Sequence, residues 1–103
     1  MLSKNPLNLI REKKLSKEEL AEALRLSIIA ELDAINLYSQ LARLVDDERY
    51  RKVFEDIARE EKTHVGEFLA LLKTLDKEQV EELVKGLREV EELTGLEIPD
   101  IKG

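Results

Sequence analysis

The fold is decided by residues 48–75, which read ERYRKVFEDIAREEKTHVGEFLALLKTL. One set of side chains in this stretch recurs at alternating steps of four and three, the spacing of the buried face of a helix in a bundle. The members of this seam are Tyr50, Phe54, Ile57, Glu61, His64, Phe68, Leu71 or Leu72, and Leu75. Glu61 and His64 lie at its centre and are not apolar. The stretch therefore predicts a long helix with a polar group in the middle of its apolar face.

The preceding residues predict a second helix of the same kind, running from Ser16 to about Val45. Its seam is formed by Leu24, Ile28, Glu31, Ile35, Tyr38, Ala42 and Val45. Asp46 and Asp47 provide a turn. Glu31 precedes this turn, and Glu61 follows it, by about fifteen residues, which is ~22 Å along an antiparallel pair of helices. We therefore expect Glu31, Glu61 and His64 to face one another.

Local signals set the remaining boundaries. Ser16-Lys17-Glu18-Glu19 is a capping box, and Asp76-Lys77-Glu78-Gln79 repeats the pattern at the start of a shorter third helix that Thr94-Gly95 closes. These signals predict an all-α chain made of an antiparallel two-helix hairpin and a short C-terminal helix. We expect an N-terminal lead over residues 1–15, a helical domain over 16–96, and a tail or linker over 97–103.

Composition excludes several classes of function. The chain has no cysteine, so thiol catalysis, disulfides and iron–sulfur clusters are excluded. A net charge of −6 disfavours nucleic acid and anionic membranes as partners and favours cations. No apolar run approaches the ~20 residues of a transmembrane helix. The N-terminus also lacks the apolar core of a signal peptide, so we expect a cytoplasmic protein.

A chain of 103 residues is too short for a hairpin to bury all its apolar surface. The first predicted helix also carries a second apolar stripe, which a two-helix hairpin cannot bury by itself. It comprises Leu26, Ile29, Leu37, Leu41 and Leu44. The surplus predicts at least one interface between subunits.

Glu61-Lys62-Thr63-His64 places a carboxylate and an imidazole one turn apart on one helix face. Di-iron proteins of the carboxylate-bundle type take a Glu from each of two helices and a Glu-x-x-His from each of two others. With Glu31, this chain supplies half of that set, and a two-fold dimer supplies the whole. Such an oxygen-rich site suits iron, with Glu61 bridging two metals and Glu31 and His64 each terminating one.

Tyr38, two turns from Glu31, is placed to hydrogen-bond a ligand or buffer an electron. The alternative is a metal-free Glu–His hydrogen bond that only sets the register of the bundle.

Two stretches carry a resemblance to a known family. They are Ala30-Glu31-Leu32-Asp33-Ala34-Ile35-Asn36-Leu37-Tyr38 and Ala58-Arg59-Glu60-Glu61-Lys62-Thr63-His64-Val65-Gly66-Glu67-Phe68. Over residues 16–96 the chain resembles the encapsulated ferritins, most of all the archaeal type, in which this domain can precede an encapsulin shell protein.

The resemblance implies half of a ferritin four-helix bundle that is completed by dimerisation. It further implies a ring of dimers, typically a decamer, that oxidises Fe(II) with dioxygen inside an encapsulin nanocompartment, where Fe(III) is stored. Glu31, Glu61 and His64 are the ligands that it implies, with Tyr38 beside the centre and Asp33 as an outer metal ligand. Zinc or calcium are other occupants that such outer sites accept.

Three rival readings belong to other classes or chemistries. One is a structural module in which zinc, calcium or iron stabilises the assembly without turnover. Another is a metal-free helical bundle that docks cargo to a shell. A third is a peroxidase of the rubrerythrin kind, which is disfavoured because the chain lacks the cysteines of that enzyme's second iron site.

Overall fold

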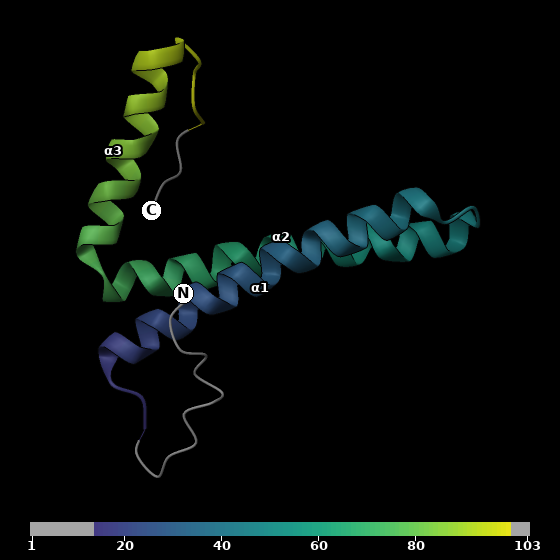
Figure 1. Cartoon of the computed structure of the whole chain (residues 1–103), viewed down its shortest axis with the longest axis horizontal. Coiled ribbons are helices and arrows are strands. Elements are labelled where there is room, and N and C mark those ends of the chain that lie inside the picture. The colour runs from purple at the N-terminus through teal and green to yellow at the C-terminus, as the bar shows by residue number, and fades with distance from the viewer. Residues whose placement is uncertain (1–13, 100–103) are drawn as a thin grey trace.

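The structure is a computed structural model of the chain, and it describes residues 14–99. Three helices follow one another: α1 spans Lys17–Leu44, α2 spans Glu48–Leu75 and α3 spans Lys77–Thr94 (Figure 1). No strand occurs within residues 14–99, so the predicted all-α class is confirmed. Most of the predicted N-terminal lead and the last residues of the predicted tail lie outside the described residues. None of the described helices is long and apolar enough to span a membrane.

The helix starts are set by the side chains that the sequence indicates. At the start of α1 the Glu19 N–H donates to Ser16 Oγ at 3.1 Å, and the Ser16 N–H donates to the Glu19 carboxylate at 2.9 Å. Asp47 caps α2 by accepting the Arg49 N–H at 2.9 Å. These bonds satisfy backbone donors that have no partner within the helix, which is why each helix begins where it does.

The end of α3 is fixed by Gly95, which adopts a left-handed conformation with φ of 75°. Its N–H donates to the Glu91 carbonyl at 2.8 Å. A residue with a Cβ would be strained there, which is why glycine closes the helix.

α1 and α2 form the predicted antiparallel hairpin (Figure 1). Its core is thin: Ala21, Leu24 and Leu72 are buried near the open end, with Ile28 and Phe68 packed against them. Nearer the turn, Ala42 and Ala58 are buried and allow the two helices to approach closely. Of the two leucines that the seam left open, Leu72 is 2% exposed and Leu71 is 54% exposed, so Leu72 is the core residue.

Much apolar surface stays uncovered in the single chain. In the second stripe of α1, Ile29, Leu37 and Leu44 are 53%, 50% and 79% exposed. At the start of α2, Tyr50 is 60% exposed although it belongs to the predicted seam. The exposed stripe of α1 follows from the size of a hairpin, since each helix can bury only the side that faces the other. For Tyr50, the prediction that it lies in the buried seam is wrong in the single chain.

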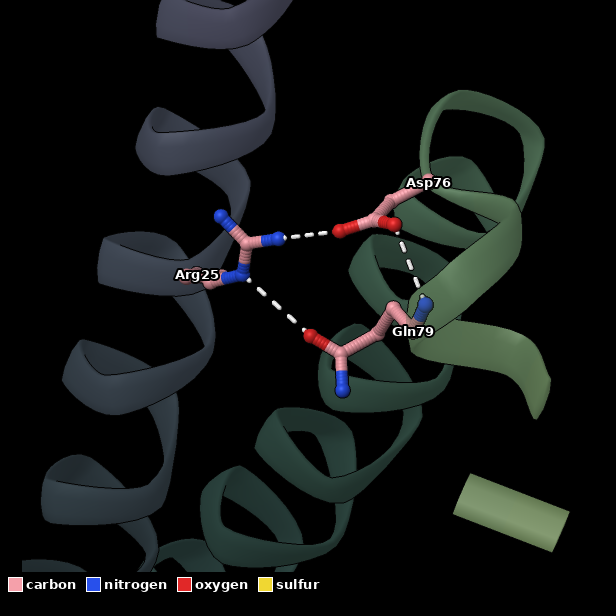
Figure 2. A network of polar contacts seen from close by, with 3 residues as sticks. All are labelled: Arg25, Asp76 and Gln79. Carbon is pink, nitrogen blue, oxygen red and sulfur yellow. Dashed lines mark hydrogen bonds and ion pairs between the residues drawn. The ribbon is translucent and has the colours of Figure 1, made fainter. Parts of the chain in front are cut away.

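α3 turns away from the long axis of the hairpin (Figure 1) and buries none of its side chains. A polar network holds its first turn to α1. Arg25 donates through Nη2 to Asp76 Oδ2 at 2.5 Å and through Nε to Gln79 Oε1 at 3.3 Å (Figure 2). Asp76 also caps α3 by accepting the Gln79 N–H at 3.0 Å. One arginine thus fixes the corner between α2 and α3 from the opposite helix.

Candidate metal centre

The three polar residues of the seams lie together at mid-height of the hairpin. Glu31 comes from α1, and Glu61 and His64 come from successive turns of α2. His64 Nδ1 lies 3.5 Å from Glu31 Oε2 and 3.4 Å from Glu61 Oε2. One ligand-type atom from each residue lies within 4.8 Å of the other two. The structure therefore brings together the three residues that the hairpin register predicts to face one another.

The group is half-buried and its polar atoms are incompletely satisfied. The Glu31 and Glu61 side chains are 20% and 18% exposed, whereas the His64 side chain is 44% exposed. Glu31 Oε2 is buried and accepts no hydrogen bond within the described part of the chain. A buried carboxylate oxygen without a partner is costly, and a second carboxylate beside it adds repulsion. A cation between the two carboxylates removes both penalties.

The donor set fits a hard divalent cation with some affinity for imidazole. Two carboxylates and one imidazole are ligands that iron accepts, and without a thiolate they do not favour soft metals. Among residues 14–99, three such residues gather in one group, so a metal held by them keeps open positions. Those positions can receive ligands from a second copy, or a substrate.

Two further predicted residues, Tyr38 and Asp33, make no hydrogen bond or ion pair with this group within the described residues. The Tyr38 ring stacks on Phe54, with centroids 6.3 Å apart and an interplanar angle of 15°. Within residues 14–99 its hydroxyl makes no hydrogen bond to the group. Asp33 is exposed and is not among the clustered ligand-type residues. The roles of Tyr38 and Asp33 stay predictions.

A groove lined by cations, which the sequence did not predict, lies on the side of the hairpin away from the metal-type group. This groove of about 760 Å³ runs between α1 and α2, and four cationic side chains line it. These are Arg43, Arg51, Arg59 and Lys62. Residues 39–62, which include all four of these side chains, hold similar numbers of cations and carboxylates. The sequence therefore shows no excess of positive charge, and only the positions of the side chains around the helices show that the cations gather on one side.

Comparisons with known proteins agree with this fold. A hairpin carrying a Glu and a Glu-x-x-His at one height is the arrangement of the ferritin-like class. A sequence model of the family described as Rubrerythrin matches residues 22–97. Among solved structures, the encapsulated ferritin domain from Pyrococcus furiosus is similar with a TM-score of 0.84 at 62% identity, covering 95% of this chain and 100% of that one. The chain therefore belongs to the rubrerythrin family and, within it, to the encapsulated ferritins.

Two curated relatives are larger proteins. The ferritin-like–encapsulin shell fusion protein of Pyrococcus furiosus is 64% identical over 97 residues, which are 94% of this chain. The encapsulin nanocompartment cargo protein EncC of Myxococcus xanthus is 39% identical over 75 residues, or 73% of this chain. The chain spans 28% and 58% of the lengths of these two relatives.

Proposed function

We propose that two copies of this chain form a ferroxidase centre that binds a pair of Fe(II) ions as substrate and oxidises them with dioxygen. The observation that carries this proposal is the group of Glu31, Glu61 and His64, whose ligand-type atoms lie within 4.8 Å of one another, while the buried Glu31 Oε2 accepts no hydrogen bond from the described residues. Each copy supplies one lone Glu and one Glu-x-x-His, and the complete set of a carboxylate-bundle site needs two of each.

In this proposal Glu61 bridges the two irons, and Glu31 and His64 each complete the coordination of one. Negative charge from four carboxylates favours Fe(III) over Fe(II), because the more highly charged ion gains more from nearby anions. Two Fe(II) ions lose one electron each, and one dioxygen accepts the pair. Tyr38, which stacks on Phe54 and follows Glu31 by two turns of α1, is proposed to steady a ligand or buffer an electron. Asp33 is proposed as an outer ligand for arriving metal.

The uncovered apolar side chains support dimerisation and a larger assembly. Ile29, Leu37 and Leu44 are at least half exposed in the single chain, and Val90 and Leu93 of α3 are 42% and 86% exposed. Surface of this kind is usually covered in an assembly. We propose that dimers form across the side that carries Glu31 and Glu61, and that a ring of dimers, a decamer by resemblance, uses the remaining apolar surface.

The named relatives suggest where the reaction takes place. One is fused to an encapsulin shell, and another is a cargo protein of an encapsulin nanocompartment. We propose that this chain likewise works inside an encapsulin compartment in the cytoplasm and delivers Fe(III) there for storage.

The test is oxidation of Fe(II) by the purified chain. Protein is loaded with Fe(II) without oxygen and then exposed to air, and ferric absorbance is followed over time. The parent should oxidise several equivalents faster than free Fe(II), and His64→Ala should fall to the background rate. Glu60→Ala is the matched control, since Glu60 is an exposed neighbour of Glu61 and should keep the parent rate.

If the parent binds iron but oxidises it only at the background rate, the centre is structural and the ferroxidase proposal is wrong. Replacing dioxygen with peroxide in a parallel run identifies the working oxidant.

A further inference from the structure

The groove on the other side of the hairpin is lined by cations in a protein that is acidic as a whole. Arg43 of α1 and Arg51, Arg59 and Lys62 of α2 line it, and Glu55 is the one carboxylate among the lining residues. Ala42 and Ala58, which also line the groove, are 4% and 5% exposed. The net charge of the chain is −6, so this concentration of positive charge is local.

Helix geometry separates this groove from the candidate metal centre. Successive residues of a helix are about 100° apart, so Lys62 points well away from its neighbour Glu61, and Arg59 points farther still. The hairpin therefore carries carboxylates and His64 on one side and the cationic groove on the other. A dimer formed across the carboxylate side leaves the groove open.

Two of the four cations are held in place by neighbours. Arg51 donates through Nη2 to the Val45 carbonyl at 3.0 Å, which fixes its guanidinium beside the hairpin turn. Arg59 pairs with Asp56 at 3.1 Å. Each guanidinium keeps further N–H donors.

The other two cations, Arg43 and Lys62, form no ion pair within the described part of the chain. Four cations and one carboxylate, Glu55, are thus among the described residues that line the groove. Like charges gathered in this way repel one another, and an anion between them relieves that repulsion.

We propose that this groove binds a multiply charged oxyanion of the phosphate type. Three guanidinium groups favour such a ligand, because their fork of N–H donors matches two oxygens of one phosphate. Arg51 and Lys62 are eleven residues apart on α2, which is about 16 Å along the helix, so the row of cations is longer than a single phosphate and suits a short chain of them. A long nucleic acid is a poorer fit, because the acidic surface beyond the groove repels it.

The test uses protein freed of metal with a chelator and then dialysed, so that iron cannot bridge the anion to the protein. Tripolyphosphate is titrated into the parent chain by calorimetry, with ATP in a parallel titration. Saturable binding with one site per chain is expected. Equal affinity for the two ligands identifies the phosphate groups alone as the recognised part, and tighter binding of ATP indicates a nucleotide source.

The decisive comparison is between two double variants that remove the same charge. Arg43→Gln with Lys62→Gln should weaken tripolyphosphate binding about tenfold or more, since each removes a charged hydrogen bond. Lys52→Gln with Lys85→Gln removes two exposed cations outside the groove and should change affinity by less than about twofold.

Absence of saturable binding, or equal weakening in both double variants, would overturn the proposal. So would binding of polyglutamate without binding of tripolyphosphate, because an acidic peptide would then be the preferred ligand. Since no iron is present, these outcomes do not depend on whether the chain is a ferroxidase.

Discussion

Replacing Arg25 with alanine should loosen α3 while leaving the hairpin folded. The Arg25 guanidinium donates one hydrogen bond to the Asp76 carboxylate and one to the uncharged Gln79 amide oxygen, across 51 and 54 residues of sequence (Figure 2). Hydrogen bonds to charged groups contribute about 1.5–3 kcal/mol when buried. Here the Arg25 and Asp76 side chains are 41% and 28% exposed, so solvent screening reduces the loss to roughly 1–2 kcal/mol.

The expected thermal shift follows from the size of the domain. At about 4–8 °C per kcal/mol, the midpoint of unfolding should fall by roughly 5–15 °C, measured at fixed protein concentration. Hydrogen exchange should quicken more in Lys77–Thr94 than at mid-hairpin, since α3 buries none of its own side chains and opens more readily than the hairpin. Asp76 still caps α3, so circular dichroism should show the same helix content.

Arg59→Ala is the matched control. Arg59 also pairs with an aspartate, but Asp56 lies on the same helix and the two side chains are 70% and 63% exposed. Pairs of this kind contribute at most about 0.5 kcal/mol. If Arg25→Ala and Arg59→Ala lower the midpoint equally, or if exchange in α3 does not change, the network does not hold the corner as described.

Three other changes have defined outcomes. Leu72→Ala removes a core side chain that is only 2% exposed and should destabilise the chain by about 2–3 kcal/mol in chemical unfolding, at the low end for leucine because a thin core can collapse; a loss below about 1 kcal/mol would contradict the packing. Ser16→Ala removes the acceptor of the Glu19 N–H and should cost about 1 kcal/mol by the same assay, with fraying confined to the first turn of α1; a neutral result would contradict the cap. The Arg49 guanidinium beside Asp47 lowers the pKa of that carboxyl from its ordinary 3.8, so its stabilising effect is present above that value and is lost as pH falls through the lowered pKa. Asp47→Asn keeps a capping oxygen but loses the charge, so its thermal midpoint should be lower than that of the parent near neutral pH. In strong acid the two midpoints should converge. A difference that persists in acid would mean that the cap, and not the charge, is responsible for the stability.

The helices and the metal-type group could be predicted because their determinants are local. Ser16, Asp47 and Asp76 cap the helices that they precede, and the bounds of α2 and α3 match the predicted ones. The height of Glu31 relative to Glu61 follows from the length of two helices joined by a short turn, which leaves little freedom in the register.

The features that sequence reasoning missed depend on side chains that meet across the fold. The sequence around Arg25 does not indicate Asp76 and Gln79 as its partners. These residues meet only because α3 leaves the hairpin in one particular direction, and the hydrogen bonds from Arg25 help to set that direction. The choice between Leu71 and Leu72 depends on how α2 rotates against α1. The cationic groove combines residues from both helices. Along the chain these cations alternate with carboxylates, so the net charge of the sequence stretch gives no sign of the groove.

The central claim is that Glu31, Glu61 and His64 form half of a two-iron centre that a second copy completes. Native mass spectrometry of the chain loaded with Fe(II) without oxygen tests it most directly, since mass reports subunits and metals together. The account predicts dimers, or multiples of dimers, that carry two irons each, and loss of both irons in Glu61→Ala. A monomer that retains one iron, or a dimer whose iron content is the same in Glu61→Ala, would contradict it.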